Sequence, residues 1–172
     1  RAPCSRCRTC CRCRTWAPRA NRSWGGTRVV AMGVSCYSST NLHDWKFEGL
    51  VLPAVTKNRS HDLHSTKVIE RPKVIYNRAT RKFVMWLHID SENYAAARSG
   101  VAVSDSPTGP FTYLGSFRPN AGIWPENVTE SDKQPAKDNA LARDFAGGQM
   151  ARDMTVFVDD DGKAYQFYSS EE

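Results

Sequence analysis

The chain has 172 residues, of which 40 % are apolar, 10 % aromatic and 24 % charged, a composition typical of a globular protein. No run approaches the roughly 18 consecutive apolar residues of a membrane-spanning helix, and the first 30 residues lack the apolar block of a secretory signal. The net charge of +6 would suit nucleic acid only if the basic side chains were spread over the folded body.

Charge and cysteine are instead concentrated in a head, residues 1–30. This head holds eight of the 24 basic side chains and none of the 18 acidic ones, so the remainder, residues 31–172, is slightly acidic. The head shows no periodicity and has little apolar area to offset the entropy of ordering it. We predict that it is a disordered leader or an artefact of a wrongly assigned start. Five of the six cysteines lie there, at Cys4, Cys7, Cys10, Cys11 and Cys13.

These cysteines predict no metal site, because a structural zinc site pairs two cysteine or histidine knuckles and the second knuckle is missing. We expect no metal and no cofactor. A polyanion-binding arm remains an alternative function for the head, and it would show a steep salt dependence of binding.

From Met32 the sequence consists of short β-like runs separated by turn residues. Residues 33–39 alternate in polarity and predict a strand, and residues 50–52 form a short apolar run. Residues 74–76 and 83–89 flank a polar turn, which predicts a hairpin.

Two further strand pairs follow. Residues 100–103 and 111–117 are joined by a turn that contains Pro and Gly. Residues 155–158 and 164–168 flank an Asp-Gly turn and predict a second hairpin. Between these pairs, residues 122–148 are polar and resemble an insertion. Because no ten-residue stretch has helical periodicity, the body is predicted to be all-β.

A weak internal repeat places residues 71–76 on residues 152–157. Repeated antiparallel four-stranded units favour a β-propeller, with a β-sandwich as the rival fold. In a propeller, the innermost strands begin beside a central channel. Two carboxylates precede or begin the repeated strands, Glu70 and Asp153.

Paired carboxylates in a pocket suit the hydrolysis of a glycosidic bond. Alternation along a strand predicts that the neighbours Arg71 and Arg152 point to the opposite side and leave both acids unneutralised. The plainer alternative is a pair of surface ion pairs. The His61/His64 pair is interpreted as two solvated loop residues, and Asp90 either borders the pocket or caps its strand.

Six segments of the body carry a resemblance to a known family. They are residues 33–42, 44–50, 69–77, 84–90, 100–111 and 152–165. Together they resemble glycoside hydrolase family 43, in its exo-β-1,3-galactanase-like branch, over residues 32–172. The resemblance implies a five-bladed β-propeller and hydrolysis with inversion at the anomeric carbon. Five blades need about 250–300 residues, so we expect an incomplete propeller of roughly two to three blades.

The resemblance also implies roles for three residues. Asp153 matches the aspartate that orients the general acid and raises its pKa. Glu70 resembles the glutamate that hydrogen-bonds the terminal galactose, and Tyr94 resembles a tyrosine of the same subsite. The family's general acid is a glutamate of a later blade, and no residue here matches it, so this chain is expected to be inactive alone.

The expected activity of the parent protein is exo-acting release of galactose from β-1,3-galactan or arabinogalactan. The partner is then a polysaccharide or oligosaccharide, not nucleic acid or a membrane, and the parent is extracellular or periplasmic. The alternatives are a non-catalytic carbohydrate-binding propeller and another family 43 activity, such as that of an arabinosidase, xylosidase or galactofuranosidase.

Overall fold

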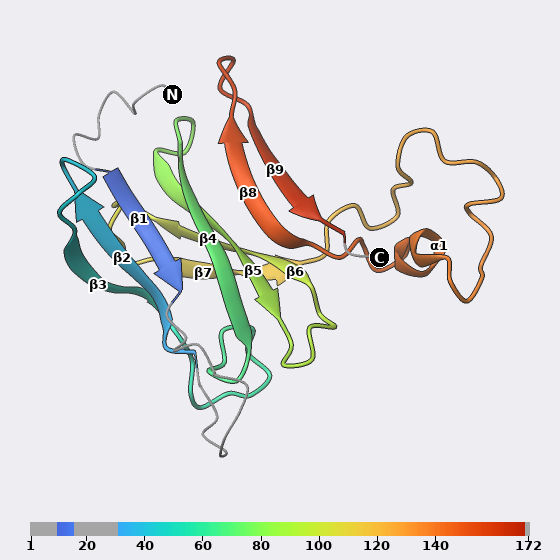
Figure 1. Cartoon of the computed structure of the whole chain (residues 1–172), viewed down its shortest axis with the longest axis horizontal. Coiled ribbons are helices and arrows are strands. Elements are labelled where there is room, and N and C mark those ends of the chain that lie inside the picture. The colour runs from blue at the N-terminus through green and yellow to red at the C-terminus, as the bar shows by residue number, and fades with distance from the viewer. Residues whose placement is uncertain (1–9, 16–30, 171–172) are drawn as a thin grey trace.

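The computed structural model describes residues 10–15 and 31–170, with side chains from residue 31 onward. Nine strands form three antiparallel sheets in this part of the chain, in the orders β1-β2-β3, β4-β5-β6-β7 and β8-β9 (Figure 1). The elements are β1 (Cys10–Thr15), β2 (Gly33–Ser39), β3 (Lys46–Pro53), β4 (Val68–Asn77), β5 (Lys82–Asp90), β6 (Arg98–Ser104), β7 (Thr112–Phe117), α1 (Ala140–Asp144), β8 (Arg152–Val158) and β9 (Ala164–Ser169).

The predicted all-β class and both predicted hairpins are confirmed. The β4–β5 and β8–β9 hairpins close on the predicted polar turns, and Gly162 has the positive φ, +85°, that the second turn requires. The second sheet is a four-stranded antiparallel meander. Among the described residues, α1 is the one α-helix, and no helix is long and apolar enough to cross a membrane.

The first strand of each sheet lies beside the first strand of the next. β1 contacts β4, and β4 contacts β8, so these three strands run side by side while the other strands extend away from them (Figure 1). This is the relation between the innermost strands of successive propeller blades. The starts of β4 and β8 are therefore brought together.

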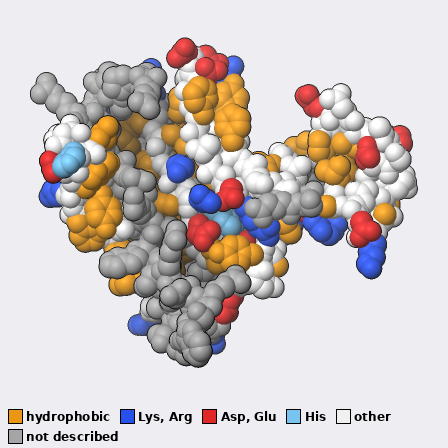
Figure 2. All heavy atoms as spheres, in the orientation of Figure 1, with side chains coloured by type: hydrophobic (Ala, Val, Ile, Leu, Met, Phe, Trp, Pro, Cys, Tyr) orange, Lys and Arg blue, Asp and Glu red, His pale blue; other side chains and the backbone are white. Residues whose placement is uncertain are grey.

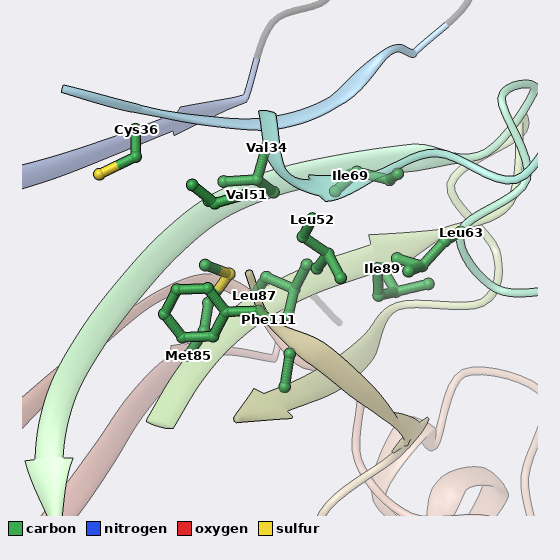
Figure 3. Close-up of a cluster of buried hydrophobic side chains, with 11 residues drawn as sticks. Val34, Cys36, Val51, Leu52, Leu63, Ile69, Met85, Leu87, Ile89 and Phe111 are labelled. Carbon is green, nitrogen blue, oxygen red and sulfur yellow. The ribbon is translucent and has the colours of Figure 1, made fainter. Parts of the chain in front are cut away.

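The main core lies between the first two sheets (Figure 3). Met85, Leu87 and Ile89 of β5 are buried there against side chains of β2 and β3. Because side chains alternate along a strand, His88 and Asp90 of β5 point to the other face, toward β8. The strand thus separates an apolar face from a polar one.

A β-bulge recurs at the start of β4 and β8. The register shifts between Glu70 and Lys73 and again between Arg152 and Thr155. The first residue inside each bulge has a positive φ, +53° at Arg71 and +42° at Asp153. In the structural repeat, Glu70 is therefore equivalent to Arg152, and Arg71 is equivalent to Asp153. This is one residue further than the predicted repeat, because the bulges and not the side-chain types fix the equivalence.

Part of the head differs from the predicted disordered leader. Residues 10–15 form β1, whose Cys13 lies opposite Cys36 in the ladder with β2. An antiparallel ladder needs only backbone groups on the free edge of β2, so it forms without apolar periodicity. The prediction for residues 1–9 and 16–30 lies outside the described residues. So does the expectation about cysteine ligands, while no cluster of metal-ligating side chains occurs among those described.

The third sheet exposes a row of aromatic side chains. Phe157 lies opposite Tyr165 in the β8–β9 ladder, and Phe167 follows on the same face. Their exposed fractions are 53 %, 44 % and 57 %, far above those of a sheet face covered by a neighbour. This face therefore has the composition of a surface that packs against another layer.

Candidate functional site

The site is built on the start of β4. Glu70 pairs in register with His88 of β5, and Tyr94 stands on the loop that follows β5. The Tyr94 hydroxyl donates a hydrogen bond to Glu70 Oε1 at 3.1 Å, and His88 Nδ1 lies 3.6 Å from Glu70 Oε2. Glu70 and Tyr94 remain 42 % and 44 % exposed, whereas His88 is buried. The solvent-facing carboxylate of Glu70 thus has two neighbours, the buried ring of His88 and the hydroxyl of Tyr94.

Neighbouring groups keep Glu70 ionised. The facing imidazole of His88 lowers the pKa of Glu70 most strongly, partial burial opposes it, and the Tyr94 hydroxyl and Arg71 lower it further. An ionised carboxylate accepts hydrogen bonds and donates none. Glu70 can therefore receive hydroxyl groups from a polyol ligand.

Asp90 caps the loop that carries Tyr94. Its Oδ1 accepts hydrogen bonds from the backbone N–H groups of Ser91, Ala96 and Ala97 at 2.8, 2.7 and 2.9 Å. Its Oδ2 lies 2.9 Å from His88 Nε2. Of the two interpretations of Asp90, the structure supports the strand-end cap, and the carboxylate is buried rather than presented to a pocket.

Arg152 and Arg118 hold the same loop from outside β5. Arg152, at the start of β8, donates to the carbonyl oxygen of Tyr94, and its Nε lies 3.6 Å from Asp90 Oδ2. Arg118 donates to the carbonyl oxygens of Ala95 and Ala96 at 2.7 and 2.9 Å. Three charged side chains from β5, β8 and the segment after β7 thus fix the backbone beneath Tyr94.

Asp153 lies in the bulge of β8 and is paired with Arg71 of the β4 bulge at 2.6 Å. This contact contradicts the predicted orientation of Arg71 and Arg152 away from the acids. Arg71 turns toward Asp153, and Arg152 turns toward Asp90. The physical reason is the bulge, whose extra residue interrupts the alternation of side chains. The pair also places Asp153 beside β4, where Figure 2 shows acidic, basic and histidine side chains gathered between β4 and β8.

The structure thus brings Glu70 and Tyr94 into contact and links Asp153 to β4 through Arg71. Sequence reasoning missed the supporting roles of His88 and Arg152. The sequence did contain one indication of the role of His88. It lies two residues before Asp90, so both side chains lie on the same face of β5.

The His61/His64 pair holds no metal cluster in the part of the chain with described side chains. The two rings have separate local partners. His64 is buried, with its ring nitrogens near Thr66 Oγ1 and the Thr56 carbonyl oxygen, and Leu63 N–H donates to the ring of His61. The interpretation of His64 as solvated was therefore wrong, because the loop over residues 54–67 folds its ring inward to satisfy its own backbone.

The free energy of unfolding should fall in acid because of the buried carboxylate of Asp90. Burial raises the pKa of Asp90, but hydrogen bonds from Ala97, His88, Ser91 and Ala96 outweigh it, so the pKa is lowered. A carboxyl with a lower pKa in the folded state binds fewer protons there, and its contribution is lost as the pH falls through that pKa. Urea titrations should show the loss as the pH falls below the ordinary aspartate pKa of about 3.9 and through the lowered pKa of Asp90. An Asp90→Asn variant with an equally steep acid limb would contradict this assignment.

Neither a protein-family model nor a curated protein matches the sequence. Solved structures match it well. A GH43 β-1,3-galactosidase in complex with galactodeoxynojirimycin is 44 % identical, with a TM-score of 0.75, over 84 % of this chain and 48 % of its own length. Over these residues, the chain resembles an enzyme of glycoside hydrolase family 43 in both sequence and fold.

Two further family 43 structures are exo-β-1,3-galactanases. The enzyme of Clostridium thermocellum is 37 % identical with a TM-score of 0.63, over 90 % of this chain and 28 % of its own. The enzyme of Phanerochaete chrysosporium, in a complex with β-1,3-galactotriose, is 34 % identical with a TM-score of 0.63, over 83 % and 27 %. The chain therefore spans less than half the length of these relatives.

Proposed function

We propose that this chain carries the terminal-galactose subsite of an exo-acting β-1,3-galactanase. The observation that carries the proposal is the hydrogen-bonded pair of Tyr94 and Glu70, half-exposed at the start of an innermost strand. The carboxylate accepts sugar hydroxyl groups, and the tyrosine supplies a ring and a hydroxyl group beside it. The similarity to a β-1,3-galactosidase solved with galactodeoxynojirimycin supports galactose as the sugar.

Asp153 has a different role in the proposal. It lies one innermost strand further along, and Arg71 holds its carboxylate beside β4. A fixed carboxylate next to a second carboxyl group raises the pKa of that group, which is what a general acid requires. Asp153 would act on a glutamic acid supplied by a later blade of the five-bladed parent enzyme, with inversion at the anomeric carbon.

The same proposal makes this chain a sugar binder without hydrolytic activity of its own. The exposed aromatic face of β8–β9 supports a further blade packed there in the complete enzyme. The parent would act outside the cytoplasm, in the periplasm or extracellular space, where galactan and arabinogalactan side chains are found. No cofactor takes part in the proposed reaction.

Two measurements test the function. In NMR titrations of the whole chain, galactose should bind saturably and shift the signals of the Tyr94 loop, while glucose, arabinose and xylose bind more weakly. Incubation with β-1,3-galactobiose should release no galactose. Equal binding of all four sugars, or of none, would overturn the galactose subsite, and release of galactose would overturn the proposed inactivity.

A further inference from the structure

Three ionisable side chains lie beneath Glu70 and Tyr94 and take no part in the proposed contacts with sugar. The side chains of His88, Asp90 and Arg152 are 3 %, 0 % and 15 % exposed. Burying such groups is unfavourable unless each meets an opposite charge or a hydrogen-bond partner. If these positions served packing alone, apolar side chains would fill them better. The three charged side chains next to an exposed carboxylate therefore indicate a role beyond packing.

The two ring nitrogens of His88 face two different carboxylates. Nε2 lies 2.9 Å from Asp90 Oδ2, and Nδ1 lies 3.6 Å from Glu70 Oε2. The ring of Tyr94 completes its surroundings, with ring centroids 6.3 Å apart. The ring of His88 therefore lies between a buried acid, Asp90, and an exposed one, Glu70.

Asp90 makes this connection rigid. Its other oxygen accepts three backbone N–H groups of the Tyr94 loop, and Arg152 of β8 lies against the oxygen that faces His88. One buried carboxylate therefore sets both the orientation of the histidine ring and the position of the loop that carries Tyr94.

We propose that His88 is a positioning residue, which holds the Glu70 carboxylate in the orientation that receives the sugar hydroxyl groups. Asp90 orients the ring of His88 and keeps Glu70 and Tyr94 at a constant separation. This inference rests on the proposed galactose subsite, and it adds a buried layer of residues on which affinity depends although no sugar touches it.

A purely structural histidine is the alternative, and the chain contains a matched example. His64 is also buried, but the partners of its ring nitrogens are neutral: the Thr66 hydroxyl and backbone N–H, and the Thr56 carbonyl oxygen. The variants His88→Gln and His64→Gln change the same side chain in the same way at similar burial. Only the first touches the layer beneath Glu70.

The experiment measures two properties of each variant and of the full wild-type chain. The first is the dissociation constant for galactose from NMR titration. The second is the midpoint at which the side-chain carboxyl carbon of Glu70 titrates, since this carboxyl faces His88, Tyr94 and Arg71. We expect His88→Gln to weaken galactose binding about tenfold and to move the Glu70 midpoint to higher pH. His64→Gln should change neither.

The outcomes separate this inference from the proposed function. Unchanged affinity and an unchanged Glu70 midpoint in His88→Gln would overturn the positioning role while leaving the galactose subsite intact. If the wild type binds no galactose, the function fails, and the midpoint still decides whether His88 controls Glu70. If His88→Gln does not fold, Glu70→Gln in the half-exposed position serves instead: it should shift the Nδ1 signal of His88, and no shift would overturn the inference.

Discussion

Replacing Glu70 by alanine should weaken the binding of galactose by about a hundredfold. The carboxylate is kept ionised by His88 and Tyr94, and hydrogen bonds from hydroxyl groups to a charged acceptor are among the stronger ones in proteins. Hydrogen bonds to a charged group contribute about 1.5–3 kcal/mol each, which accounts for an effect of this size. Because the side chain is 42 % exposed, its removal should leave the fold intact.

Glu48→Ala is the matched control for this variant. Glu48 of β3 also accepts hydrogen bonds from a hydroxyl and an amino group, those of Ser38 and Lys46. It lies in the first sheet, whereas Glu70 lies in the second. Calorimetric titration with galactose should show wild-type affinity for Glu48→Ala. Equal affinity in both variants would remove Glu70 from the site, and with it the main support for the galactose subsite.

Replacing Asp90 by alanine should lower the free energy of unfolding by about 3–5 kcal/mol. The variant removes the carboxylate that accepts from the N–H groups of Ser91, Ala96 and Ala97, of which Ala96 alone keeps a second acceptor, Ser91 Oγ. It also leaves His88 and Arg152 without the buried carboxylate between them. Each buried donor that loses its partner bears a desolvation cost. The Tyr94 loop should also lose protection against amide hydrogen exchange.

Asp144→Ala provides the comparison, because Asp144 is also a buried acid, 5 % exposed, with arginine partners. Its partner Arg143 is 55 % exposed and can turn to water, so urea denaturation should show a distinctly smaller loss. A loss of the same size in the two variants would mean that Asp90 is an ordinary buried acid and that the Tyr94 loop is held by other contacts.

The strands that follow residue 31, both hairpins and the resemblance to family 43 could be predicted from the sequence, whereas β1 in the head could not. Alternation of polar and apolar side chains and the turn preferences of Gly, Pro and Asp act within a few residues, so they can be recognised without the fold. The strings around Glu70 and Asp153 likewise indicated family 43, and the resemblance paired Glu70 with Tyr94, which the structure places in hydrogen-bond contact.

The tertiary structure decided how these residues are used. The matching bulges at Arg71 and Asp153 form only when β4 and β8 pair with their partner strands, and they turn both arginines toward the acids, against the alternation rule. His88, Asp90 and Arg152 come from β5 and β8, which no local pattern brings together. Side-chain direction across a bulge and contact between sheets depend on long-range register, and that register is a property of the assembled sheets rather than of any segment.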